Sequence, residues 1–356
     1  MAADRRGPAS RANARTPVRR LLTRVLTAGL VLALTVGVIA VFLPQSTPGQ
    51  WLSTRLLFAQ VLAFPGLAGA GLVLLGLGVL ALGQRARARA QAGAVVVAVM
   101  FALLGTGLLF WPDGPPWAAG PSTATANAGR EVRVTVFNSL DTLTAADVQH
   151  LIAVANPDVL VLPEASPARV RTALVGTAFA QGVHEGDDAG FSRGRPAGVA
   201  PTAIAMHSRM GSHRPAVPTP MTFGTVALEP AGTLEGPLIV GVHTAPPLPR
   251  LMDSWRADLS RLQEMDRAAA EGPMIVAGDL NATLRHGPLA ARTHLADTAR
   301  QCPGSAEGTW PASAPPWVRA PIDHVLVTDD VQVLSCGTVQ VGASDHLAYS
   351  VELRLP

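Results

Sequence analysis

Polar side chains of the kinds that catalyse hydrolysis directly follow short apolar runs in this 356-residue chain. The clearest case is the pair Asp279 and Asn281, which comes after the apolar run 274–277. Residues two apart in an extended segment point to the same face, so we expect this carboxylate and this carboxamide to converge. Gly278 should let a ligand approach the backbone there. The carboxylate could activate a water while the amide donates to an oxyanion; a polar turn that closes a buried strand is the alternative.

Other polar residues end further apolar runs in the same way. Taken singly, each has a structural explanation as a turn, a helix cap or a buried histidine. Functional sites gather at strand ends in layered α/β folds, so we expect these side chains to meet. Carboxylate, amide and imidazole groups together suit a hard divalent cation combined with acid–base chemistry. The residues are Asn138, Glu164, His243, the neighbours Asp323 and His324, and the triplet Ser344, Asp345 and His346.

The apolar runs predict the strands that must position these side chains. We expect strands at 132–137, 159–162, 203–206, 225–228, 238–242, 274–277, 324–327, 331–334 and 347–353. The segments 145–155 and 253–270 have the pattern of helices. So many strands with so few helices indicate sheets packed face to face with helices outside.

The N-terminal third has a different character. Three uncharged apolar stretches, 25–43, 56–83 and 92–111, are each long enough to cross a bilayer, which needs about 20 residues. A cleaved signal peptide is the alternative for the first, but its core is too long and two more stretches follow. The chain therefore divides into a basic tail expected to be disordered (1–24), a membrane region with three transmembrane helices (25–111), a linker (112–129) and one domain (130–356).

The distribution of charge predicts the orientation in the membrane. All 28 basic residues are Arg, and seven of them lie in the tail, three in the loop 84–89 and one in the connection 44–55. Arg-rich flanks stay in the cytoplasm, so the third helix should carry the domain to the external face. After residue 112, 17 Arg and 24 Asp and Glu leave a net charge of −7. The pI of about 9.6 therefore belongs to the N-terminal third and is no nucleic-acid signature.

The chain has two cysteines, Cys302 and Cys336, and both lie in the domain placed outside. An oxidising exterior and an even count favour a disulfide, with two free buried thiols as the alternative. By the chain-entropy estimate, closing the loop between them would stabilise the domain by about 3–4 kcal/mol.

The ordered set of motifs resembles the endonuclease/exonuclease/phosphatase superfamily, which includes pancreatic deoxyribonuclease, abasic-site endonucleases, sphingomyelinases and inositol-phosphate phosphatases. The resemblance covers about residues 130–356 and implies a four-layer α/β sandwich of the DNase I type. Pro163 stands where many members have Gln, and few residues separate Glu164 from His243, so the substrate stays open. The matching motifs are Phe137-Asn138, the run 157–164, Val242-His243-Thr244-Ala245-Pro246, Gly278-Asp279-Leu280-Asn281, Ile322-Asp323-His324 and Ser344-Asp345-His346.

The resemblance implies a metal site and a site for the attacking water. Glu164 is similar to the principal Mg²⁺ or Mn²⁺ ligand of the family. Asn138 and Asp345 would lie close to the metal, directly or through water. Asp279 resembles the residue that orients or deprotonates the attacking water, and Asn281 resembles the donor to a non-bridging phosphoryl oxygen.

The resemblance also gives roles to two histidines. His346, oriented by Asp323, is similar to the imidazole that contacts the phosphate or acts as base. His243 resembles the second histidine of the deoxyribonuclease branch, a candidate acid for the leaving oxygen. His324 follows Asp323 directly, so it should point to the opposite side of its strand and has no role.

The sequence therefore predicts a membrane-anchored, extracytoplasmic, Mg²⁺-dependent hydrolase of a phosphodiester or phosphomonoester. A non-catalytic surface interaction protein that keeps the fold is the alternative, which the full set of polar positions disfavours. The substrate could be nucleic acid, a lipid head group or a sugar phosphate. The acidic domain disfavours sequence-independent DNA binding, although a bound cation changes the local field. No obligate protein partner is evident.

Overall fold

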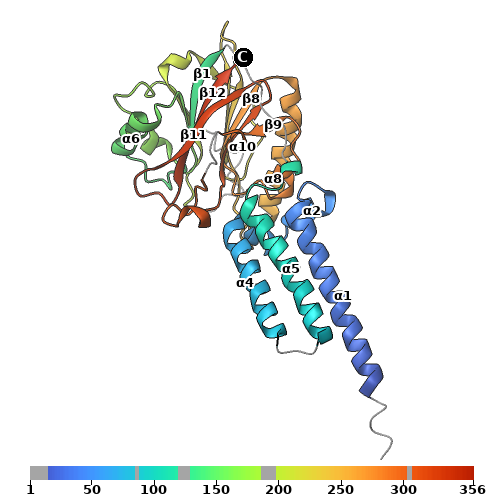
Figure 1. Ribbon diagram of the computed structural model, residues 1–356. Helices are drawn as coiled ribbons and strands as arrows, with labels where there is room; N and C mark the ends of the chain where they lie inside the picture. Colours follow the sequence, from blue (N-terminus) through green and yellow to red (C-terminus); the bar gives the residue numbers. More distant parts are fainter. Residues whose placement is uncertain (1–14, 85–87, 119–128, 186–197, 303–306) are drawn as a thin grey trace, which may run out of the picture.

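A domain of two facing sheets lies on one end of a bundle of N-terminal helices (Figure 1). The computed structural model describes residues 15–84, 88–118, 129–185, 198–302 and 307–356. Most of the predicted basic tail, the middle of the Arg-rich loop and residues 119–128 of the predicted linker lie outside the described residues.

In the described part of the domain each sheet has six strands, and neighbouring strands follow the orders β11-β12-β1-β2-β4-β3 and β5-β6-β7-β8-β10-β9. In the first sheet the strands are β1 (Arg130–Val136), β2 (Val159–Leu162), β3 (Val183–Glu185), β4 (Ala203–Met206), β11 (Gln332–Gln340) and β12 (Leu347–Leu355). In the second they are β5 (His213–Pro215), β6 (Gly224–Pro230), β7 (Leu238–His243), β8 (Met274–Asp279), β9 (Leu295–Asp297) and β10 (Asp323–Thr328). β-Branched residues of both sheets meet in one buried core.

Helices cover the outer face of each sheet, which gives the four layers that the sequence predicted. On the first sheet these are α6 (Ala145–Ala155) and α7 (Pro167–Ala173); on the second, α8 (Met252–Ala268) buries an apolar face that includes Trp255. Short turns of helix join the strands: α9 (Gly287–Ala290), α10 (Thr298–Gln301), η2 (Ser208–Met210), η3 (Ala269–Glu271) and η4 (Pro316–Val318).

The predicted strands are all present, and the differences are at the edges. The three-residue strands β3, β5 and β9 were not predicted, because so short a segment shows no periodicity. β11 extends to Gln340 although its second half is polar and partly exposed, since pairing with β12 along its length satisfies its backbone. The predicted disulfide between Cys302 and Cys336 is confirmed and joins the end of α10 to β11.

The N-terminal region forms α1 (Arg15–Phe42), α2 (Thr47–Ser53), α3 (Phe58–Ala63), α4 (Pro65–Gly83), α5 (Ala88–Phe110) and η1 (Pro116–Ala118). Among the residues that the structure describes, two helices are long and apolar enough to cross a membrane, Pro65–Gly83 and Gln91–Phe110. A third candidate is the pair Thr27–Phe42 and Thr47–Ser53, which is bent by 95° and counts only if the pair is one span.

Two boundaries in the bundle differ from the sequence-based expectation. The apolar stretch 56–83 divides at Phe64, so that α3 is separate from the longer α4. α1 already begins at Arg15, so the last part of the predicted disordered tail is helical. Glycines let α4 and α5 pack closely. A Cβ atom at Gly69 would lie only 2.7 Å from the carbonyl oxygen of Gly105. Small residues at a helix contact are typical of membrane bundles.

Arg285 joins the domain to the outer ends of two helices. Its side chain is fully buried and donates to Val41 O (3.1 Å) near the end of α1, and to Gly107 O (3.2 Å) and Trp111 O at the end of α5. A fourth bond reaches Pro112 O at 2.9 Å. Gly107 O also accepts the Trp111 N–H at 3.3 Å and Trp111 O accepts the Gly114 N–H at 3.0 Å. The guanidinium therefore gives carbonyls at the ends of the two helices a charged donor. Residues 112–113 therefore pack against the domain at the start of the predicted linker.

Candidate active site

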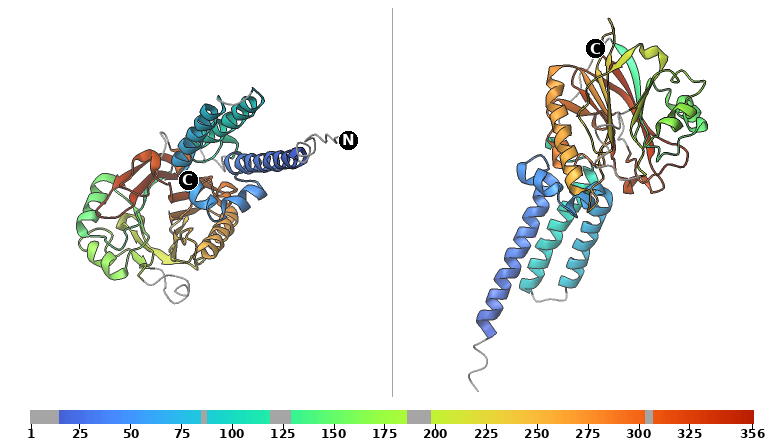
Figure 2. Two further views of the ribbon diagram at one scale, coloured as in Figure 1. Left: turned by 90° about the horizontal axis from the view of Figure 1, so that it is seen from below. Right: turned by 180° about the vertical axis from the view of Figure 1, so that it is seen from behind.

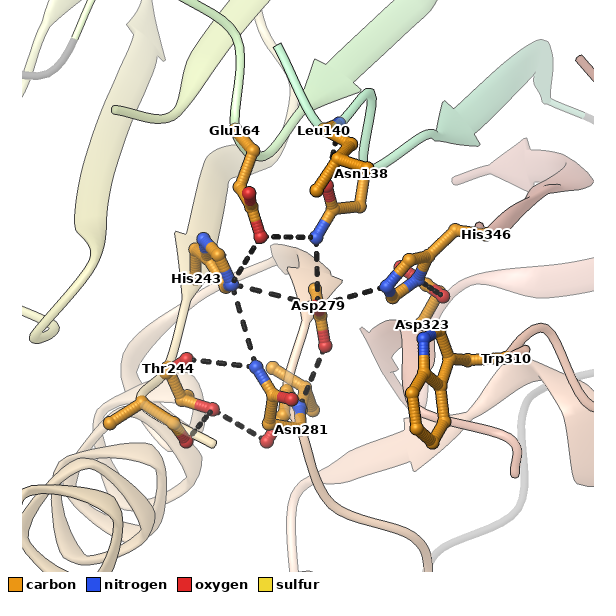
Figure 3. A network of polar contacts seen from close by, with 12 residues as sticks. Asn138, Leu140, Glu164, His243, Thr244, Asp279, Asn281, Trp310, Asp323 and His346 are labelled. Atoms are coloured by element: carbon orange, nitrogen blue, oxygen red, sulfur yellow. Dashed lines mark hydrogen bonds and ion pairs between the residues drawn. The ribbon is translucent and has the colours of Figure 1, made fainter. Parts of the chain in front are cut away.

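Strand register brings the predicted residues of the second sheet together (Figure 3). Asp279 ends β8, and its register partners are His243 at the end of β7 and Asp323 at the start of β10. Asn138 follows β1 and His346 precedes β12 in the other sheet. The two sheets thus contribute side chains to one site at the same end of the domain.

Gly278 is required by the neighbouring strand. Its φ of +154° is one that residues with a Cβ rarely adopt, and a Cβ there would lie 1.8 Å from Val242 O. The glycine therefore lets β7 approach β8, and the space is not left for a ligand as the sequence suggested. Asn281 has a φ of +43° beyond the end of β8, so a turn, and not strand alternation, brings it back to Asp279. Its backbone N–H donates to Asp279 Oδ1 at 2.8 Å.

Asn138 links two carboxylates. Its amide nitrogen donates to Glu164 Oε1 at 3.1 Å and to Asp279 Oδ2 at 3.0 Å. Its amide oxygen accepts from the Leu140 backbone N–H at 3.1 Å. Asn138 therefore holds the carboxylates near each other through its nitrogen, and ligation of a metal by its oxygen would need the amide to turn over.

Glu164 is held in a backbone conformation that few residues other than glycine adopt. Its φ is +48°, and its carbonyl oxygen accepts from Ser139 Oγ and from the Asp141 N–H, both at 2.7 Å. Such conformations persist where surrounding bonds hold them, and they concentrate at functional sites. Burial raises the pKa of Glu164, the Asn138 bond and His346 lower it, and the charges of Asp345 and Asp141 raise it further.

His346 and Asp323 form a buried pair. His346 Nδ1 lies 2.8 Å from Asp323 Oδ2, and Nε2 lies 3.8 Å from Asp279 Oδ2. Burial alone would lower the pKa of His346, but Asp323 and then Asp279 raise it to about 10. For Asp279, burial raises the pKa, the charge of Asp323 raises it further, and the two histidines oppose this. Because both ring nitrogens of His346 face carboxylates, its cationic form is favoured at neutral pH.

His243 and Asn281 lie on the other side of Asp279. His243 Nε2 is 3.5 Å from Asp279 Oδ2 and 3.9 Å from Glu164 Oε1. The Asn281 amide nitrogen lies 3.4 Å from His243 Nε2 and donates to Thr244 O at 3.0 Å. The Trp255 indole donates to the backbone oxygen of Asn281 at 3.1 Å, so α8 fixes this turn.

The residues present fit a divalent cation. Asp279, Asp323 and His346 each have a possible ligand atom, and these atoms lie within 4.8 Å of one another. His346 would have to lose its proton to ligate a metal, so the carboxylates are the better candidates. Glu164 stands beside them through the Asn138 bridge. Buried carboxylates with raised pKa values are stabilised by a nearby cation, and their oxygen atoms are the donors that Mg²⁺ and Mn²⁺ prefer.

The structure also shows neighbours of the site that the sequence did not single out. Trp310 donates its indole N–H to Asp345 Oδ2 at 2.9 Å, and no motif marked it because it lies in the loop after Cys302. His324 points away from the site, as expected from alternation. It bonds Asp297 Oδ2 (2.7 Å) and Ala282 O (2.8 Å), which holds the segment after Asn281.

The chain belongs to the endonuclease/exonuclease/phosphatase family, whose pattern it matches over residues 124–346. Two sheets between helices, with polar residues of both sheets at one end, are the fold and the arrangement that this membership implies.

Solved structures with a similar fold come from several organisms. An endonuclease/exonuclease/phosphatase from Beutenbergia cavernae is 23% identical with a TM-score of 0.49, over 64% of this chain and 72% of that one. A family protein from Bacteroides thetaiotaomicron is 15% identical with a TM-score of 0.46, over 64% of this chain and 99% of that one. Truncated Caenorhabditis elegans TDP2 is 16% identical with a TM-score of 0.46, over 63% and 98%. No curated protein matches the chain.

Proposed function

We propose that the protein is a membrane-anchored, metal-dependent phosphoester hydrolase whose domain lies outside the cytoplasm. The observation that carries the proposal is the convergence of Glu164, Asp279 and the His346–Asp323 pair at one end of both sheets. Gathering buried carboxylates lowers the stability of the fold unless a bound cation compensates their charge. Such clusters are therefore found where a metal or a reaction requires them. A non-catalytic interaction protein has no use for such an arrangement.

The metal would be held chiefly by Glu164, with Asp345 and Asn138 near it. A bound cation supplies charge neutralisation for the phosphoryl group. Asp279 is placed to orient the attacking water and accept its proton, which the depth of the site and the raised pKa support. The water oxygen bonds to phosphorus while the P–O bond to the leaving group breaks.

The remaining residues bind the phosphoryl group and protonate the product. His346, oriented by Asp323, would donate to a phosphoryl oxygen, and the two carboxylates that face its ring support this role over that of a base. The Asn281 amide would donate to a non-bridging oxygen. His243, on the other side of Asp279, would give a proton to the leaving oxygen.

The full chain in detergent should hydrolyse at least one substrate among plasmid DNA, RNA, sphingomyelin and phosphoinositides. Activity should vanish with EDTA and return with Mg²⁺ or Mn²⁺, because the carboxylates need a cation to bind the phosphoryl group. Asp279→Asn protein, purified in the same way, controls for a contaminating enzyme. If wild-type protein hydrolysed nothing with either metal, the non-catalytic alternative would replace the proposal.

The position of the Arg residues supports the proposed orientation. α1 begins with Arg15, Arg19 and Arg20, and its first turns lie at the end of the bundle away from the domain (Figures 1 and 2). α4 ends and α5 begins at that same end, on either side of the Arg-rich loop. Arg-rich ends stay in the cytoplasm, so the domain would lie on the opposite side of the membrane.

A reporter that is active only outside the cytoplasm, fused after Pro356, should therefore give a signal. The same reporter fused in the loop between α4 and α5 should be silent and serves as the control. A signal from a cytoplasm-dependent reporter at Pro356 would show that the orientation is reversed.

A further inference from the structure

The site lies at the end of the domain that faces the helical bundle. Arg130 and Leu355 are register partners at the far end of the first sheet, and the C-terminus lies there (Figure 1). Val136 and Tyr349 are partners at the other end, next to Asn138 and His346. The bundle meets the domain at this second end. The candidate catalytic groups therefore face the side on which a membrane would lie.

Loops on two sides of the site touch the bundle directly. On one side, Asp345 accepts the Trp310 indole N–H at 2.9 Å, and the Trp310 ring lies 5.9 Å from that of Phe64, the residue before α4. On the other side, the Trp255 indole donates to the Asn281 carbonyl, and its ring lies 5.1 Å from that of His286. His286 Nε2 in turn lies 3.0 Å from the carbonyl oxygen of Ala59, in α3. Trp310 and Phe64 thus connect Asp345 to the start of α4, and Trp255 and His286 connect Asn281 to α3.

The length of α4 fixes the level of the site relative to a bilayer. Its 19 residues rise about 28 Å at about 1.5 Å per residue, close to the thickness of a hydrocarbon core of about 30 Å. If α4 spans the core, Pro65 lies at its edge, and Phe64 and Trp310 lie among the head groups. The rings of Phe42, Trp111 and Trp117 cluster at this end of the bundle, as aromatic belts do.

The domain itself reaches this level through the segment that follows Trp310. A Cβ added at Gly66, the second residue of α4, would lie 2.1 Å from the carbonyl oxygen of Trp317. The Trp317 side chain is 62% exposed although its neighbour is an apolar helix. An exposed indole at the end of a span is the side chain that inserts between head groups.

The bundle leaves part of this face of the domain open. Seen in Figure 1 and from below in Figure 2, the helices lie under the half that contains α8, while the half with α6 projects beside them. The segment between α2 and α3 adds exposed apolar side chains near the same level, Leu56 and Leu57, the latter 72% exposed. A surface of this kind next to a span suits contact with lipid.

We propose that the substrate is a membrane phospholipid, whose head-group phosphoester enters the site from the leaflet next to the domain. This inference rests on the proposed hydrolytic function and on the proposed anchoring. Water adds to the lipid phosphorus, one P–O ester bond breaks, and its oxygen takes a proton. A lipid lying in the leaflet has its phosphate at the level of the site, whereas a nucleic acid would have to approach between the domain and the membrane surface.

The depth of Trp317 tests the geometry without any activity. The full chain carrying Trp317→Cys, labelled with a nitroxide and reconstituted in phosphatidylcholine–phosphatidylglycerol vesicles, should be more accessible to oxygen than to a water-soluble nickel reagent. Thr233→Cys is the control, because Thr233 is exposed in the turn between β6 and β7, at the end of the second sheet away from His243 and the site; its label should show the opposite preference. Equal preference for the nickel reagent at both positions would overturn the inference.

Hydrolysis rates test the substrate class. In the same vesicles, Trp317→Ser should lower phospholipid hydrolysis by about tenfold and leave a soluble probe, bis(4-nitrophenyl) phosphate, unchanged. Trp317→Phe should keep most of the lipid rate, and Thr233→Ala should change neither rate. If the protein cleaves the soluble diester or single-stranded DNA but no phospholipid, the inference fails and the hydrolytic function stands. If it cleaves none of them, the hydrolytic function fails as well.

Discussion

His346→Ala is expected to slow hydrolysis by about 100-fold or more at every Mg²⁺ concentration, the usual scale of losing a preorganised donor to the charge that develops in the transition state. Both ring nitrogens of His346 face carboxylates, so the substitution removes a cation from the place where the phosphoryl charge would lie. It also leaves Asp323 buried without its partner. Added metal does not replace the imidazole, so the rate should stay low across a Mg²⁺ titration.

Glu164→Gln is the contrasting variant. It keeps the size of the side chain and removes the charge that would hold the metal, so activity should fall and return in part as Mg²⁺ is raised, by mass action. The hydrolysis rate of Asp323→Asn should lie between those of His346→Ala and Glu164→Gln, because this substitution would only weaken the orientation of His346. The measurement is the hydrolysis rate of each variant against Mg²⁺. If His346→Ala recovered with metal while Glu164→Gln did not, the two roles would have to be exchanged.

The sequence predicted the core of this site because the chemistry and the strands share one pattern. Asp279 lies at the end of an apolar run, and its partners His243 and Asp323 lie at the ends of two others, so strand prediction placed all three. Register then brings them together: β7 runs parallel to β8, so their last residues meet, and β10 runs antiparallel, so its first residue meets the last residue of β8. The roles of these residues in catalysis stay predictions.

Other features could not be predicted because they depend on contacts between distant segments. Trp310 lies in a loop with no periodicity, and only the folded chain shows that its indole bonds Asp345 and touches Phe64. The positive φ of Glu164 follows from bonds made by Ser139 and Asp141, 25 and 23 positions earlier in the chain. The sequence singled out Gly278 as a place where a ligand could approach the backbone. Only the structure shows that β7 occupies this space.

The docking of the domain on the bundle was also absent from the sequence-based expectation. The composition of the segment 112–129 predicts a linker, and such a composition gives no signal of packing against the domain. Its first residues instead accept bonds from Arg285 and Arg300. An arginine buried by chain segments more than 170 positions away leaves no local pattern.

Arg285→Met is expected to destabilise the full chain by about 3–5 kcal/mol, the usual cost of breaking a buried charged network. Burial lowers the pKa of Arg285 to about 10, with Asp113 opposing this, so the side chain is charged at neutral pH. Methionine fills much of the same volume but removes the charged donor from the carbonyl groups of Val41, Gly107 and Trp111. In detergent, the melting temperature should fall by about 10 °C.

Arg285→Lys and Arg250→Met complete the experiment. Lysine keeps the charge but presents a single ammonium, which cannot reach all the carbonyls that the planar guanidinium bonds, so its melting temperature should lie between those of wild type and Arg285→Met. Arg250 is exposed on the same domain, so Arg250→Met should melt within about 1–2 °C of wild type. Arg285 lies four residues beyond Asn281, so weaker packing of the domain against the helices should also lower the hydrolysis rate. If Arg285→Met had the same melting temperature as Arg250→Met, the guanidinium would not join the domain to the helices as the structure places it.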